Sequence, residues 1–145
     1  MSTESYLWTK IDKAMETWEG DYHFTRHEDK SRPGIPDVSY GMLGVNGWIE
    51  LKARDKWPVD PEKLVRFRHE LTRPQRRFQR KRGAAAGHVF VMLIVGRKNN
   101  AEYLLFPWQT EMHLEASTRA ELYELACYYS VGKINVRDFV SSLTA

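Results

Sequence analysis

The most apolar stretch of the chain is residues 88–96, which read HVFVMLIVG. It is short and rich in β-branched side chains, so it fits a strand better than a helix. Its residues do not alternate between apolar and polar, which is the pattern of a strand buried on both faces. We therefore expect a fully buried central strand here, in an α/β protein whose sheet is flanked by helices.

Helices are expected on either side of this strand along the chain. Apolar residues at helical spacing predict a first helix over residues 4–20. A second helix is predicted over residues 72–87, with a proline tolerated in its first turn. A capping box formed by Thr118 and Glu121 opens a third helix over residues 119–129, and residues 131–145 form a short helix or a loop.

The remaining elements are strands. They are predicted at residues 21–29, 35–42, 47–53, 88–96 and, after a turn at Asn99-Asn100, up to residue 106. Residues 30–34 form a loop, and Asn46-Gly47 is a strong signal for a hairpin turn between the second and third strands. The order is therefore α-β-β-β-α-β-β-α, in one layer of sheet. A chain of 145 residues without internal repeats is expected to be one domain, 1–145.

Three charged residues lie in the predicted hairpin, where packing alone gives no reason for them. Side chains alternate along a strand, so Glu50 and Lys52 share one face. Pairing with the preceding strand can bring Asp37 beside Glu50 on that face. Two buried carboxylates repel each other, and a divalent cation removes the repulsion. The pattern therefore predicts a Mg²⁺ site, completed by a main-chain carbonyl, waters and a substrate phosphate.

Lys52 has a separate role in this hypothesis. Its ammonium can stabilise an attacking water or the charge that develops on a phosphate during hydrolysis. The alternative is a surface hairpin on which Glu50 and Lys52 form an ion pair worth at most ~1 kcal/mol. The proline before Asp37, the glycine-rich turn and the apolar flanks favour the metal site.

These residues carry a resemblance to a known group of enzymes. Pro36-Asp37 followed by Glu50-Leu51-Lys52 is similar to the motif of the PD-(D/E)xK nuclease superfamily. More narrowly, RPGIPDV, WIELKA and LTRPQRRFQRKRGAAAGHVFVML resemble the virus-type replication-repair (VRR-NUC) nucleases, which are similar to Holliday-junction resolvases. The resemblance covers about residues 4–106 and leaves residues 107–145 as a C-terminal β-α extension without a chemical role. It implies a restriction-endonuclease-like core with a central mixed sheet, and hydrolysis of DNA with Mg²⁺, for which Mn²⁺ substitutes.

The resemblance also implies further site residues. Gln75, in the first turn of the second helix, joins the site, and the backbone carbonyl of Leu51 joins the two carboxylates as a metal ligand. The family tends to supply a carboxylate from its first helix, for which Glu4 is the candidate, with Glu19 as second choice. The alternatives are a solvated polar residue for Gln75 and an anion favouring the helix dipole for Glu4.

Cations are concentrated in one part of the chain, although the net charge is only +3. Residues 63–82 hold nine Lys or Arg against one Glu, and such a patch attracts phosphates. The candidate DNA-binding residues are Arg26, Arg73, Arg76, Arg77, Arg80 and Lys81. The alternative is a solvated helix face. Residues 54–70 make the connection to this helix long, and they fit a DNA-contacting flap or an arm that packs on a second subunit.

The expected function is that of a Mg²⁺-dependent endonuclease of a phage type, selective for branched or junction DNA. A four-way junction requires paired cuts, so we expect a homodimer. One alternative is a phage-type nicking or double-strand endonuclease with little structure preference. Two others are a catalytically inactive DNA-binding module of the same fold and a metal-independent nucleic-acid adaptor.

Several other classes are disfavoured. The single cysteine, Cys127, excludes an intramolecular disulfide and is expected to be buried in the third helix. The histidines form no H-x-x-x-H pair, and no organic cofactor is expected. No run approaches 18 apolar residues and no apolar leader opens the chain, so we expect no membrane association. The expected compartment is the cytoplasm, of the host cell if a phage encodes the chain.

Overall fold

The computed structural model describes residues 2–28 and 31–145, whose strands form one six-stranded sheet in the order β1-β2-β3-β4-β5-β6. The strands are β1 (Tyr22–Arg26), β2 (Val38–Met42), β3 (Val45–Arg54), β4 (Val89–Val95), β5 (Glu102–Pro107) and β6 (Tyr128–Val131). The helices are α1 (Glu4–Met15), α2 (Arg73–Ala86), α3 (Arg119–Leu125) and α4 (Val136–Thr144), with 3₁₀ segments η1 (Lys98–Asn100) and η2 (Trp108–His113). β3 and β4 pair in parallel, and the other neighbouring strands pair antiparallel.

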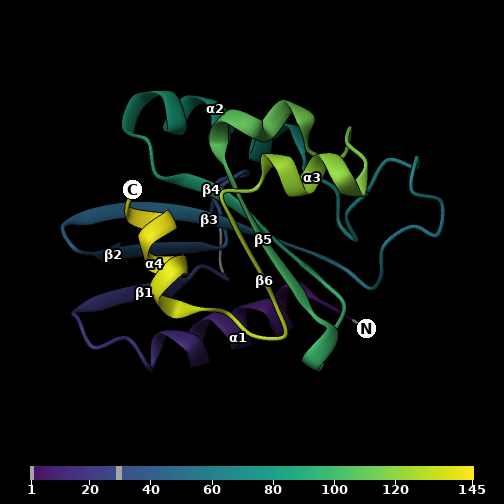
Figure 1. The fold of residues 1–145 in the computed structure, drawn as a ribbon. Helices are drawn as coiled ribbons and strands as arrows, with labels where there is room; N and C mark the ends of the chain where they lie inside the picture. Colours follow the sequence, from purple (N-terminus) through teal and green to yellow (C-terminus); the bar gives the residue numbers. More distant parts are fainter. Residues whose placement is uncertain (1, 29–30) are drawn as a thin grey trace.

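β4 lies in the middle of the sheet, and all of its residues are buried. Its alternate side chains enter two different cores. Met92 and Ile94 pack in a core that also holds the apolar faces of α1 and α4. Val91 and Leu93 pack in a second core with α3 and residues 65–71. The buried central strand and the α/β class with a mixed sheet flanked by helices are therefore confirmed, and Figure 1 shows the helices on both sides of the sheet.

The hairpin turn between β2 and β3 is formed by Leu43-Gly44. Met42 pairs with Val45, and the two residues between them have φ of 53° and 75°. Two consecutive left-handed residues form the kind of two-residue turn that matches the twist of the strands. Asn46-Gly47 instead lies inside β3, so the turn predicted there is wrong.

Gly47 is required by a close approach and not by a turn. It pairs with Tyr40 across the hairpin, and a Cβ at Gly47 would collide with the Tyr40 ring and lie 2.6 Å from the His88 carbonyl oxygen. The Tyr40 hydroxyl donates a hydrogen bond to the Leu143 carbonyl at 2.7 Å. The glycine therefore lets the tyrosine connect the hairpin to α4.

The third predicted helix is shorter than expected. α3 ends at Leu125, and residues 128–131 form the edge strand β6 in place of the last helical turn. The Cys127 N–H donates to the Leu105 carbonyl at 2.8 Å, which starts the pairing of β6 with β5. Pairing with β5 satisfies backbone groups that the local helical pattern would have left on an open edge. Cys127 is exposed, so its predicted burial in a helix is wrong.

The two ends of the chain also refine the prediction. α1 ends at Met15, earlier than residue 20, and α4 makes the last segment a helix that buries Phe139, Val140 and Leu143. Asp29 and Lys30, where the first predicted strand ends and the following loop begins, lie outside the described residues. None of the helices in residues 2–28 and 31–145 has the length and apolar character needed to cross a bilayer.

Residues 55–72 connect β3 to α2 and pack on the chain's own core. Val65 and Phe67 are buried beside α3, and the Trp57 Nε1–H donates to the Glu102 carboxylate at 2.5 Å. Burial would raise the pKa of Glu102, but hydrogen bonds from this tryptophan and two tyrosines hold it below its ordinary value.

Val59, in the same connection, is 95% exposed. Within this connection, the exposed residues around Val59 are the part that is free to contact DNA or a second subunit.

Replacing Gly47 with alanine is expected to destabilise the fold by roughly 1–3 kcal/mol, because the added methyl group forces the Tyr40 ring out of place. Gly41→Ala, in the partner strand, is the control, since its new Cβ would approach the far end of the Asn46 side chain at 3.2 Å. Urea unfolding followed by tryptophan fluorescence measures both. Equal stability of the two variants would contradict the close approach at Gly47.

Candidate functional site

Asp37 and Glu50 occupy the next opposed positions beyond the last β2–β3 pair. Val38 pairs with Ile49, and both of these side chains enter the core that holds α1 and α4. Because side chains alternate, the preceding Asp37 and the following Glu50 lie on the opposite face. The Asp37 carboxylate accepts a hydrogen bond from the Leu51 N–H at 2.8 Å. The structure therefore brings both predicted carboxylates to one end of the hairpin, on the face covered by α2.

Glu50 and Lys52 form a buried ion pair. Both side chains are 3% exposed, and the Lys52 Nζ lies 3.8 Å from Glu50 Oε2. Taking such a pair out of water costs several kcal/mol per ion, which the attraction and further hydrogen bonds must offset. Lys52 Nζ also donates to the Gln75 Oε1 at 3.1 Å and to the Glu70 carbonyl at 3.2 Å. The alternative of a surface ion pair on a solvated hairpin is therefore wrong.

Gln75 connects the two charges, and the start of α2 fixes its position. Its side-chain nitrogen donates to Glu50 Oε2 at 3.3 Å while its oxygen accepts from Lys52. Thr72 caps the helix: its hydroxyl accepts from the Gln75 N–H, and its own N–H donates to Gln75 Oε1. This reciprocal capping orients the amide. Gln75 is thus joined to the predicted site and is not a solvated residue of the first turn.

The carboxylates fit a magnesium ion that relies on substrate and water for part of its shell. Mg²⁺ is usually bound through one or two carboxylates together with waters and substrate phosphates. N–H and C=O of one strand residue point to the same side, so the Leu51 carbonyl is directed towards Asp37, whose carboxylate accepts from the Leu51 N–H. Among residues 2–28 and 31–145, no group of three or more His, Cys, Asp or Glu side chains could hold a metal. Asp37, Glu50 and this carbonyl are therefore the candidate metal ligands at this end of the hairpin.

The described contacts of Glu4 and Glu19 do not include Asp37, Glu50 or the residues bonded to them. The Glu4 carboxylate is 21% exposed and lies 3.1 Å from the His69 Nδ1, at the start of α1. Glu19 is exposed beyond the end of α1. In the described part of the chain, neither joins a metal-binding group with Asp37 and Glu50.

A basic groove borders the site along α2. It has a volume of about 1330 Å³, and no acidic residue among those described lines it. Seven cations line it: Arg32, Arg73, Arg76, Arg77, Arg80, Lys81 and Arg82. Pro33 and Pro74 also line it. A Cβ on the following Gly34 would collide with the Pro74 carbonyl, so this loop packs directly on the first turn of α2. The groove therefore adjoins both Gln75 and the loop that leads to Asp37.

The predicted DNA-binding residues divide into three groups. Arg73, Arg77 and Lys81 are exposed in the groove. Arg76 donates to the carboxylates of Glu111 at 2.8 Å and Glu115 at 3.3 Å, and Arg80 donates to Glu111 at 2.8 Å. Arg26 lies elsewhere, in β1, where it donates to the Ser5 hydroxyl at 2.9 Å and pairs with Glu28.

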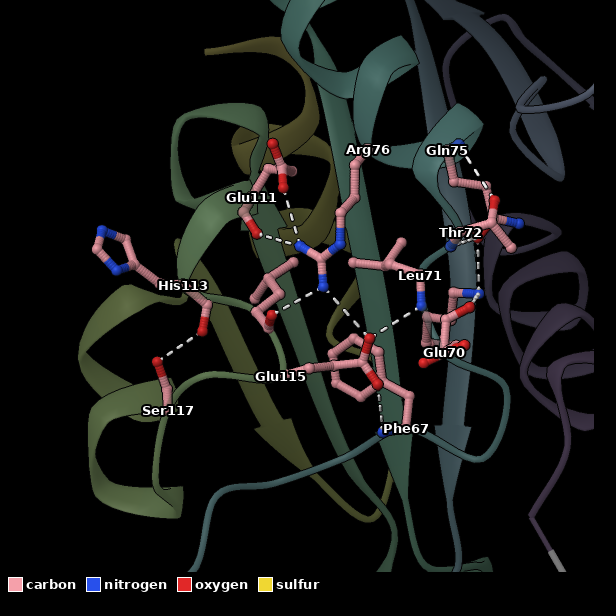
Figure 2. Close-up of polar contacts among 12 residues, drawn as sticks. Phe67, Glu70, Leu71, Thr72, Gln75, Arg76, Glu111, His113, Glu115 and Ser117 are labelled. Atoms are coloured by element: carbon pink, nitrogen blue, oxygen red, sulfur yellow. Dashed lines mark hydrogen bonds and ion pairs between the residues drawn. The ribbon is translucent and has the colours of Figure 1, made fainter.

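Figure 2 shows Arg76 between two glutamates from the segment after β5. Glu111 and Glu115 are 4% and 6% exposed, and no sequence pattern predicted a role for either. The number of arginines on α2 was the one signal in the sequence for these acids, because an arginine of this helix that faces the core needs an acidic partner. Sequence alone does not say where in the chain those acids lie.

Comparison of the chain with protein-family models found no match, and comparisons with curated proteins and with solved structures found none.

Arg76→Ala is expected to destabilise the protein by roughly 3 kcal/mol, because it leaves Glu111 and Glu115 buried without their shared cation. Arg77→Ala, at the next position of the same helix, removes an exposed arginine and should change stability by less than about 0.5 kcal/mol. Thermal and urea unfolding of the two variants test this. A small effect at Arg76 would mean that the buried network contributes little to stability.

Proposed function

We propose that this protein is a Mg²⁺-dependent endonuclease that hydrolyses phosphodiester bonds of DNA. One observation carries the proposal: the half-buried Gln75 joins the buried Glu50–Lys52 ion pair, with Asp37 beside it, to the helix along which cations line a groove. A protein gains no stability from burying a lysine and a glutamate that apolar residues could replace. A site that activates water and neutralises charge needs those groups.

The chain's own residues have distinct roles in this proposal. Asp37, Glu50 and the Leu51 carbonyl hold the metal ion, Mg²⁺ or Mn²⁺. When bound, the ion would lower the pKa of the water that it binds and would place positive charge beside the phosphate. The Lys52 ammonium, held by Gln75, stabilises negative charge that develops on the phosphate. Gln75 keeps Lys52 and Glu50 in fixed relative positions through its two hydrogen bonds.

The groove supplies binding of the DNA backbone. Its exposed arginines and lysine attract phosphates without reading sequence. We therefore propose selection by DNA structure, with branched or junction DNA as substrate. Paired cuts at such a substrate call for a homodimer with two sites. As its compartment we propose the cytoplasm, of a host cell if a phage encodes the chain.

A panel of junction, flap, single-stranded and duplex DNAs, incubated with purified protein and either Mg²⁺ or EDTA, tests the activity and its selectivity. Cleavage of junctions and flaps is expected with Mg²⁺ and not with EDTA. Equal cleavage of plain duplex DNA would contradict structure selectivity and would favour a general nicking or double-strand endonuclease. Binding without cleavage under every condition would overturn the enzymatic proposal and favour a DNA-binding module.

Asp37→Asn and Glu50→Gln are expected to abolish Mg²⁺-dependent cleavage and the gain in melting temperature that Mg²⁺ gives the native protein, because each removes a metal ligand. Lys52→Ala should slow single-turnover cleavage on the order of a hundredfold while keeping that gain, since its charge acts in the transition state. Glu62→Gln, in the exposed connection, is the control. Wild-type cleavage by both carboxylate variants would refute the metal site.

Arg77→Ala combined with Lys81→Ala should weaken binding to every DNA in the panel alike. The slope of log affinity against log salt should fall by about one for each phosphate that the variant no longer neutralises. Lys13→Ala with Lys133→Ala removes the same charge outside the groove and is the matched control. An identical reduction in affinity in both double variants would show a general effect of net charge and contradict a DNA path along α2.

A further inference from the structure

Glu115 is a buried carboxylate held in an uncommon backbone conformation. It lies in the extension after β5, its exposed fraction is 6%, and its φ is +68°, in the left-handed region. A non-glycine residue there costs free energy, and it persists where the surroundings over-determine it. The contacts of the side chain are therefore the place to look for its role.

Three donors converge on this carboxylate, as Figure 2 shows. The Phe67 N–H donates to Oε1 at 3.1 Å, and the Leu71 N–H donates to Oε2 at 2.9 Å. The Arg76 guanidinium donates to Oε2 at 3.3 Å. Glu115 thus holds residues 67–71 of the connection against the first turn of α2.

One of these bonds reaches the candidate site through a single peptide group. The Leu71 N–H and the Glu70 carbonyl belong to the same planar peptide, and that carbonyl accepts the hydrogen bond from Lys52 Nζ at 3.2 Å. The orientation of the peptide decides where its carbonyl points. The negative charge at its N–H end also polarises the carbonyl, which strengthens its bond to an ammonium.

We propose that Glu115 is a positioning residue for Lys52. By fixing the Glu70–Leu71 peptide, it keeps the ammonium of Lys52 where Gln75 and Glu50 also contact it. Arg76 contributes by holding the Glu115 carboxylate beside α2, one residue after Gln75. The inference rests on the proposed function for its kinetic part, and on the contacts alone for its structural part.

Glu115→Gln tests the proposal against a matched variant, Glu111→Gln. Both change a buried glutamate of the same segment that pairs with Arg76, but the described hydrogen bonds of Glu111 do not reach the Glu70–Leu71 peptide. At saturating enzyme, Glu115→Gln should lower the single-turnover cleavage rate roughly ten- to a hundredfold, because small displacements of a catalytic group are costly. Glu111→Gln should stay within about twofold. Equal rates in the two variants at equal melting temperature would overturn the proposal.

A double-mutant cycle separates positioning from a loss of stability. In a Lys52→Ala background, Glu115→Gln should cause no further loss of rate, because its effect passes through the absent ammonium. An undiminished loss in that background would show that Glu115 acts by another route and would refute the assignment.

A measurement without DNA keeps this inference distinct from the proposed nuclease activity. With ¹³C-labelled lysine, the Cε resonance of Lys52, assigned by its loss in Lys52→Ala, should shift in Glu115→Gln and stay in place in Glu111→Gln. An unmoved resonance in Glu115→Gln would overturn the positioning role even if the protein cleaves DNA. Failure of the native protein to cleave any DNA, together with a shifted resonance, would refute the nuclease and leave the positioning intact.

Discussion

The buried ammonium of Lys52 is the constraint on which this part of the structure depends. An unpaired charge in such a place would cost many kcal/mol, so the fold must surround it with acceptors. β3 supplies the Glu50 carboxylate, α2 supplies the Gln75 amide oxygen, and the connection between them supplies the Glu70 carbonyl. Three separate stretches of chain therefore have to meet at one atom, and the Thr72 cap and the Glu115 carboxylate hold two of them in place.

Much of the fold follows from local pattern. The apolar run of β4, the capping box at Thr118 and the helical spacing of α1 each predicted an element that the structure contains. The failures have tertiary causes. Gly47 follows an asparagine, as a turn glycine often does, but it is needed because the ring of Tyr40 leaves no room for a Cβ. Residues 128–131 continue a helical pattern but form a strand because they pair with the edge of β5. A propensity cannot register a partner that lies elsewhere in the chain.

The candidate site divides in the same way. Strand alternation was enough to place Glu50 with Lys52, whereas Gln75 was implied by the family resemblance and its first-turn position was only compatible with that role. The register that sets Asp37 opposite Glu50 depends on the Leu43-Gly44 turn, which lies inside the predicted loop but not at the Asn46-Gly47 turn expected there. Glu111 and Glu115 could not be found, because a buried acid far along the chain is recognised by the cations that it meets.

The parallel pairing of β3 and β4 has a consequence for the order of assembly. Parallel neighbours need a crossover between them, and here the crossover is residues 55–72 with α2, which also carries two partners of Lys52. The Leu71 N–H bonds to a residue that lies 44 positions further along the chain. Contacts so distant in sequence form late, because loop closure comes first. The three partners of Lys52 thus leave the ribosome before β4 does, but the Leu71–Glu115 bond can form only after synthesis has passed residue 115.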